Sequence, residues 1–239
     1  MTVTPADPTA LLARLAAVEQ RVDRACEAAG RDRTEVTLLP VSKTRPVEDA
    51  LVVARTGHRL IAENRVQELA GKAAHSGDEI DWVLIGHLQT NKAKDIVGLV
   101  TQFQALDSLK LATMLDRRLQ AAGLGLDVLV QVNTSGEATK AGASPDEAEA
   151  LCRGLSAFSS LRPRGLMTIA TNTDDPAEAD RCFATLAALR ERLRQDGVAG
   201  SEWPELSMGM SGDLEAAIRH GATMVRVGRA IFGARPPVA

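Results

Sequence analysis

The first segment of the chain has apolar positions at a helical period. Between residues 8 and 29 they recur every three or four positions, at Leu11, Leu12, Leu15, Val18, Val22 and Cys26. This spacing puts them on one face of an amphipathic helix. Gly30 follows directly, and a glycine just beyond the last apolar position is typical of a helix end. We therefore predict an N-terminal helix that packs one face against the rest of the protein.

After this helix, short apolar runs alternate with amphipathic segments. The runs cover residues 36–43, 59–63, 82–86, 103–107, 127–133, 165–169, 205–209 and 224–228. They are rich in Val, Leu and Ile and end at polar residues, which is typical of buried parallel strands. The segments between them have helical character, at 47–56, 65–75, 90–98, 108–122, 145–156, 177–196 and 213–220.

Eight strands that alternate with helices predict an α/β protein with one (β/α)8 TIM barrel and an extra N-terminal helix. The alternative is an open doubly wound sheet, which usually has fewer strands. The 239 residues contain no composition shift or low-complexity linker, so we expect a single domain over 1–239.

Composition and charge exclude several classes of function. Hydrophobic residues make up 45% and charged residues 25%, and the net charge is −3, so no strong field attracts nucleic acid or an anionic membrane. We expect no signal peptide and no membrane helix, and hence a cytoplasmic protein. Cys26, Cys152 and Cys182 lie far apart without metal-ligand spacing, so we interpret them as small buried thiols and expect no metal site.

Lys43 is the first candidate for chemistry, because it ends an apolar strand and is followed by Thr44 and Arg45. Working residues of such barrels cluster at the carboxyl ends of the strands. Partial desolvation and a neighbouring cation both lower the pKa of a lysine, which makes its neutral amine a nucleophile for an aldehyde. The alternative is an ordinary strand-end lysine that reaches water.

Two glycine-containing turns after the seventh and eighth strands are suited to a phosphate. Residues 207–213 read Ser-Met-Gly-Met-Ser-Gly-Asp before a helix, and residues 226–233 read Arg-Val-Gly-Arg-Ala-Ile-Phe-Gly. Free backbone N–H groups at such turns bind anions, and barrels often hold phosphate after strands seven and eight. Alternatively, Ser211 or Asp213 only starts the helix as its N-cap.

Other polar residues also follow predicted strands. They are Glu63-Asn64-Arg65, His87, Asn133 and Met167, each in a position to reach the same end of the barrel. His87 is a candidate acid or base, or only a hydrogen-bonded histidine at a strand end.

Seven stretches together resemble the pyridoxal-phosphate homeostasis proteins, also called the YggS or PROSC family. They are Leu39–Lys43, Glu63–Glu68, Ile85–Lys92, Gln131–Asn133, Gly165–Met167, Leu206–Asp213 and Val225–Gly233, and they follow the family's order along nearly the whole chain. The family fold is a single barrel like the N-terminal domain of alanine racemase. One departure is visible, since Ala62 stands where the family usually has glycine.

The resemblance implies a site for pyridoxal 5'-phosphate. The implied cofactor-binding residues are Lys43, Asn64, His87, Met167, Ser211, Arg226, Gly228 and Arg229. By resemblance, Lys43 forms the internal aldimine, and Ser211 with the backbone of Gly228 and Arg229 holds the phosphate. Arg226 faces the pyridine nitrogen, which a permanent cation keeps unprotonated. The remaining three line the ring.

The same resemblance is compatible with two roles, a carrier of the cofactor and an enzyme that uses it. Related racemases use a tyrosine from a C-terminal domain, whereas this chain contains no tyrosine, and only six residues follow Gly233. Racemisation with two bases needs an acid or base on each cofactor face. We therefore expect a non-catalytic monomer that carries or buffers pyridoxal phosphate, supports vitamin B6 and amino-acid balance, and contacts apo-enzymes transiently. The alternatives are a pyridoxal-phosphate-dependent amino-acid racemase and a Schiff-base aldolase that acts on a sugar phosphate.

Overall fold

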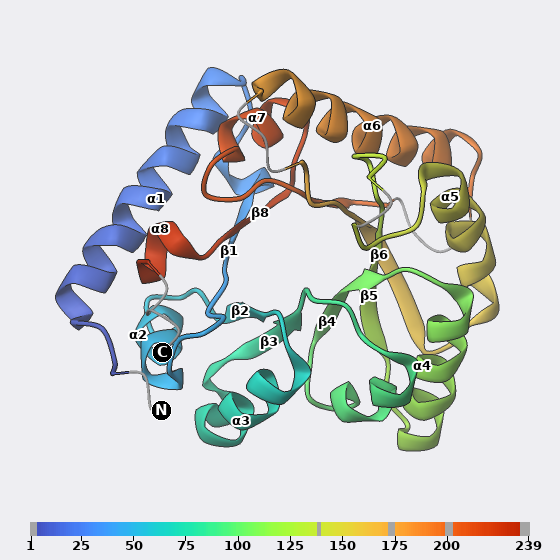
Figure 1. The fold of residues 1–239 in the computed structure, drawn as a ribbon, viewed down its shortest axis with the longest axis horizontal. Helices are drawn as coiled ribbons and strands as arrows, with labels where there is room; N and C mark the ends of the chain where they lie inside the picture. The colour runs from blue at the N-terminus through green and yellow to red at the C-terminus, as the bar shows by residue number, and fades with distance from the viewer. Residues whose placement is uncertain (1–3, 138–139, 172–174, 199–202, 235–239) are drawn as a thin grey trace.

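Eight parallel strands form a barrel with helices around it (Figure 1). A computed structural model describes residues 4–137, 140–171, 175–198 and 203–234. The strands are β1 (Thr37–Pro40), β2 (Leu60–Glu63), β3 (Asp81–Leu84), β4 (Gln102–Leu106), β5 (Leu126–Gln131), β6 (Leu161–Met167), β7 (Glu205–Ser207) and β8 (Met224–Val227). Each strand from β2 to β7 pairs with the next in the chain, and β8 pairs with β1.

A parallel bridge between Val41 and Ala62 brings the end of β1 to β2, and the Ser42 N–H donates to the Ala62 carbonyl at 3.0 Å. The ring of strands therefore comes close to closure at the end where Lys43 lies. The predicted single barrel with its extra N-terminal helix is confirmed.

The helices cover the outside of the barrel. They are α1 (Pro8–Ala28), α2 (Val47–Ala54), α3 (Val66–Ser76), α4 (Leu109–Ala122), α5 (Pro145–Gly154), α6 (Pro176–Gln195), α7 (Leu214–Arg219) and α8 (Arg229–Phe232). The predicted helix at 90–98 is instead a 3-10 helix, η3 (Thr90–Ile96). Its buried residues, Ala93 and Ile96, are three positions apart, a spacing that three residues per turn places on one side. No helix among the described residues is long and apolar enough to cross a membrane.

β6 begins four residues earlier than the run at 165–169 predicts. Pro163 disfavours a strand in the sequence, because proline cannot donate to a strand ladder. In the structure the register between β5 and β6 shifts from Val128 opposite Pro163 to Leu129 opposite Gly165. This extra residue accommodates the proline, as bulges do.

Apolar side chains form two separate cores. The larger lies between strands and helices, and the smaller fills part of the barrel interior with Leu39, Val41, Ala62, Val83 and Met224. The Ala62 methyl group, the departure from the family pattern, is thus a fully buried part of this inner cluster.

The N-terminal helix is fastened to the C-terminal part of the chain by arginines. Arg14 Nε donates to the Ile231 carbonyl at 2.7 Å, and Arg21 donates to the Ser211 carbonyl at 3.2 Å. Arg21 also pairs with Glu215 on α7 at 2.9 Å. Through these bonds α1 supports the segments that follow β7 and β8.

Candidate cofactor site

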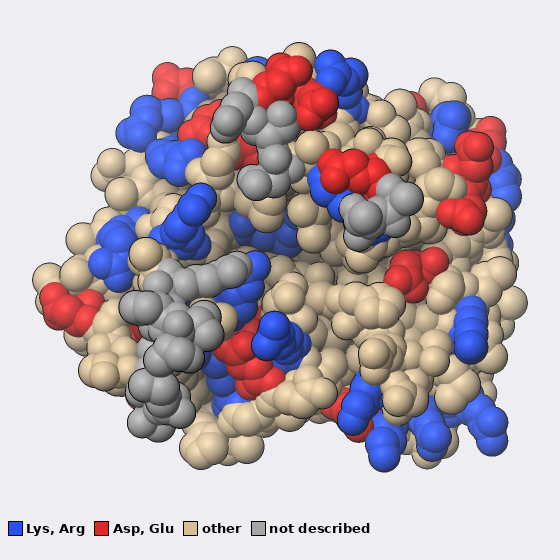
Figure 2. Space-filling model, viewed as in Figure 1, with Lys and Arg blue, Asp and Glu red and all other residues tan. Residues whose placement is uncertain are grey.

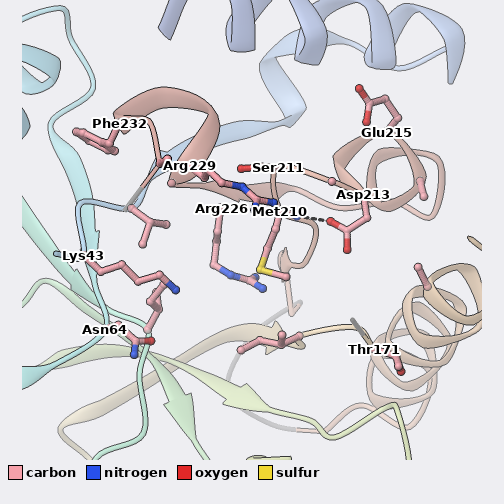
Figure 3. Close-up of a pocket in the computed structure, with 18 of the residues that line it drawn as sticks. Lys43, Asn64, Thr171, Met210, Ser211, Asp213, Glu215, Arg226, Arg229 and Phe232 are labelled. Atoms are coloured by element: carbon pink, nitrogen blue, oxygen red, sulfur yellow. Dashed lines mark hydrogen bonds between the residues drawn. The ribbon is translucent and has the colours of Figure 1, made fainter. Parts of the chain in front are cut away.

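A cavity of about 930 Å³ opens at the carboxyl ends of the strands. Its lining includes six of the eight predicted site residues, namely Lys43, Asn64, Ser211, Arg226, Gly228 and Arg229. In Figure 3, the Lys43 and Arg226 side chains reach into this space from different strands, with Ser211 and Arg229 above them. Figure 2 shows lysine and arginine side chains around a hollow in the middle of this face, which suits an anionic ligand.

Lys43 leaves the end of β1 in a constrained backbone. The next residue, Thr44, has φ of 65°, in the left-handed region that β-branched residues rarely adopt. Its N–H donates to Glu68 Oε1 at 2.5 Å. Such strain persists only where the surroundings hold it, and it is common near functional sites.

The loop after β7 turns tightly beside the cavity and contributes to its lining. Gly209 has φ of 89°, and a Cβ there would lie 2.5 Å from the Ala217 Cβ, so only glycine fits. The Asp213 carboxylate accepts from the Met210 N–H at 2.5 Å rather than capping α7. The Ser211 hydroxyl accepts from the Ala230 N–H at 3.4 Å, which joins this loop to α8.

Arg226 is a buried cation on the inner side of β8. It is 3% exposed, and its guanidinium donates to Ser207 Oγ and to the Thr168 carbonyl, both at 2.7 Å. Burial lowers the pKa of Arg226 to about 10, while the Asp213 charge raises it. The guanidinium therefore remains positive at neutral pH although the hydroxyl and the carbonyl that accept its hydrogen bonds are neutral.

The two other predicted cofactor residues are not among the described lining of the cavity. The His87 side chain is 56% exposed, and its Nδ1 lies 3.1 Å from Asp107 Oδ2. Met167 is fully buried in the larger core. Of the other candidates, Asn133 Nδ2 donates to the Glu137 carbonyl at 2.9 Å, and Arg65 is the N-cap residue directly before α3.

The sequence interpretation missed the apolar walls and the support behind Lys43. Ile85, Ile169 and Met210 line the cavity, and the last two are 41% and 36% exposed. Glu68 and Lys72 form an ion pair beneath the Lys43 segment. Their spacing of four residues on a helix after the second strand is the signal that indicates such a pair.

Comparison with known proteins first defines the class. The alanine racemase N-terminal domain matches residues 13–236. Alanine racemase of Clostridium difficile superposes with a TM-score of 0.74 at 16% identity, over 92% of this chain and 57% of that chain. The chain is thus a barrel of the alanine racemase N-terminal class. The likeness to the racemase structure concerns the fold alone.

Closer relatives then define the family. A pyridoxal phosphate homeostasis protein from Pseudomonas aeruginosa is 42% identical over 222 residues, which cover 92% of this chain and 94% of that protein. PipY of Synechococcus elongatus, solved with pyridoxal phosphate bound, is 34% identical with a TM-score of 0.78, over 89% of this chain and 99% of that chain. The chain belongs to the pyridoxal phosphate homeostasis protein family, as its sequence motifs predict.

Proposed function

We propose that this protein binds pyridoxal 5'-phosphate reversibly through a Schiff base at Lys43 and serves as a carrier or buffer of the cofactor. In this role it supports vitamin B6 and amino-acid homeostasis and passes the aldehyde to apo-enzymes. The observation that carries the proposal is the meeting of Lys43, Ser211 and Arg226 around one cavity. The relatives' names and the cofactor in PipY support it.

The residues of the cavity suit the three parts of the cofactor. Lys43 supplies an amine for the aldehyde carbon; a C=N bond forms and water leaves. The Ser211 hydroxyl and the backbone of Gly228 and Arg229 lie together beside the cavity, where they would hold the phosphate. The Arg226 cation would face the ring nitrogen and disfavour its protonation, which weakens the ring as an electron sink.

The residues that line the cavity also favour binding of the cofactor over catalytic turnover. Racemisation requires a second acid or base opposite Lys43. Among the described lining residues there is no histidine, cysteine or tyrosine, and the chain contains no tyrosine at all. The three carboxylates of the lining are engaged with other groups, since Asp175 caps α6, Asp213 accepts from the Met210 N–H and Glu215 pairs with Arg21. His87, the histidine predicted for the ring, pairs with Asp107 outside that lining. This arrangement supports a protein that holds the aldehyde.

The covalent anchor can be tested by absorbance, borohydride reduction and peptide mapping. Pyridoxal phosphate added to the purified protein should produce an imine absorbance band, and reduction should fix the cofactor on Lys43. Lys43→Ala should lose both signals. Lys92→Ala, a change at an exposed lysine paired with Asp95, should keep them. Labelling that persists in Lys43→Ala would refute the anchor.

Turnover is tested separately with D- and L-amino acids in deuterated water. The loaded protein should exchange α-protons far more slowly than an enzyme does, and rates typical of enzymes, above about 1 per second, would refute the carrier role. A colourless protein that borohydride traps only with a sugar phosphate would instead identify an aldolase.

A further inference from the structure

A buried ionic network lies directly behind Lys43. It consists of Glu63 at the end of β2 and of Glu68 and Lys72 on α3. Lys72 Nζ donates to Glu63 Oε1 and, at 3.0 Å, to Glu68 Oε1. Glu63 is fully buried and Lys72 is 7% exposed, so removing these charges from water carries a substantial free-energy penalty.

This network forms hydrogen bonds with the two residues that flank Lys43 after β1. On one side, Ser42 Oγ donates to Glu63 Oε1 at 2.7 Å, and the Ser42 carbonyl accepts from Lys72 Nζ at 2.8 Å. On the other side, the Thr44 N–H donates to Glu68 Oε1 at 2.5 Å. The backbone before and after Lys43 is therefore held by one connected set of charges.

This connection explains how Thr44 keeps its unfavourable conformation. A β-branched residue with positive φ carries conformational strain. A hydrogen bond to a charged acceptor is stronger than one between neutral groups and offsets strain of this size. The Glu68 carboxylate is that acceptor, and its own position is fixed by Lys72 one helical turn away.

We propose that Glu68, Glu63 and Lys72 are positioning residues. They hold residues 42–44 in the geometry from which the Lys43 amine reaches the aldehyde. The proposal rests on the proposed function, because it concerns the same amine. None of the three residues is among the described lining of the cavity, so their effect passes through the backbone of residues 42–44. A misplacement of about 1 Å is enough to slow a reaction 100-fold.

The test measures how fast the apo-protein forms the imine band with pyridoxal phosphate in a stopped-flow experiment. Glu68→Ala should slow this reaction about tenfold, since the Thr44 N–H loses its acceptor. Binding of pyridoxine 5'-phosphate, which has no aldehyde, should stay within about twofold, because Ser211, Gly228 and Arg229, which would hold the phosphate, are unchanged. Glu68→Gln keeps an oxygen acceptor and should recover most of the rate.

Glu149→Ala is the matched control. Glu149 also pairs with a cation four residues on, Arg153, and its side chain is 27% exposed against 25% for Glu68. This control should react at the wild-type rate. A second variant, Thr44→Gly in the Glu68→Ala background, should regain part of the lost rate, because glycine adopts positive φ without strain.

An unchanged rate in Glu68→Ala would overturn the positioning role. So would an equal loss of imine formation and of pyridoxine 5'-phosphate binding, since that result indicates a damaged cavity. If the wild-type protein forms no reducible adduct at Lys43, the proposed function itself fails. The two failures are therefore distinguished by the wild-type reaction alone.

Discussion

The protein buries charge in two different ways at the same end of the barrel. Behind Lys43, the Lys72 ammonium lies against two carboxylates, so its charge is compensated by protein groups. On β8, the Arg226 guanidinium is equally buried, but it donates hydrogen bonds to a hydroxyl and a carbonyl. The first arrangement faces the backbone, whereas the second lines the cavity.

The difference shows that a buried charge can either hold protein groups in place or remain available to a ligand. An ion pair whose partners are both protein groups has little attraction left for a ligand, but it fixes the groups that it contacts. A buried cation held by neutral dipoles keeps much of its field. We therefore expect the network around Lys72 to matter most for folding, and Arg226 to matter most for the bound cofactor.

The largest effect should come from Lys72→Met. Removing one partner of a buried ion pair typically costs about 3–5 kcal/mol, because a charge remains buried without compensation. Urea unfolding of the apo-protein at neutral pH measures this loss. Lys92→Met, at a lysine that is 44% exposed, should lose less than about 1 kcal/mol. Similar losses in both variants would show that the buried network contributes no special stability.

Arg226→Met should have a smaller effect on stability. The substitution leaves Ser207 Oγ and the Thr168 carbonyl without a donor, which costs about 1–3 kcal/mol, but it also removes a buried charge. We expect a net loss of about 1 kcal/mol in urea unfolding of the apo-protein. The absorbance of bound pyridoxal phosphate should respond to pH differently, because the ring nitrogen loses its cationic neighbour. A stability loss as large as that of Lys72→Met would remove the distinction between the two sites.

The smallest effect is a pH dependence at Glu63. Burial raises the pKa of Glu63, and the single Lys72 ammonium, shared with Glu68, does not cancel this effect. A raised folded-state pKa stabilises the protein below the ordinary carboxyl pKa, and this stability is lost as pH rises through the folded value. The unfolding free energy of the wild type relative to Glu63→Gln should therefore fall as pH rises above the ordinary carboxyl pKa, which urea unfolding at several pH values measures.

Glu79 provides a control with the opposite sign. Its hydrogen bond with Arg55 lowers the pKa of this exposed carboxylate. The stability that Glu79 contributes is present above the ordinary carboxyl pKa and is lost as pH falls. Relative to Glu79→Gln, the wild type should therefore weaken toward acid. A Glu63 difference that moves in the same direction would contradict the raised pKa.

Periodicity and motifs predicted the barrel and much of the cavity, because strand ends and glycine turns leave local signals. Lys43, Ser211 and Arg226 follow such signals directly. The start of β6 was missed because Pro163 is tolerated only through a register shift between two strands. The placement of His87 depends on Asp107, which lies twenty residues away, and no local pattern reveals that pair.

The apolar walls were missed for a related reason. Ile169 and Met210 look like core residues in a sequence, and only the assembled barrel leaves them exposed at the cavity. Similarly, the spacing of Glu68 and Lys72 indicates an ordinary helical pair. Their contacts with Glu63 and Thr44 arise from the packing of α3 against the end of β1.

The pairing of β1 with β8 has a consequence for synthesis. Lys43 is synthesised well before Arg226 and the residues that α1 fastens. Domains generally fold as units when their residues are available. The strand that precedes the reactive lysine thus lacks its neighbour until β8 has been synthesised. A shorter nascent chain would present an amine without the rest of the cavity, so we expect tight capture of the aldehyde to begin only once β8 has joined the barrel.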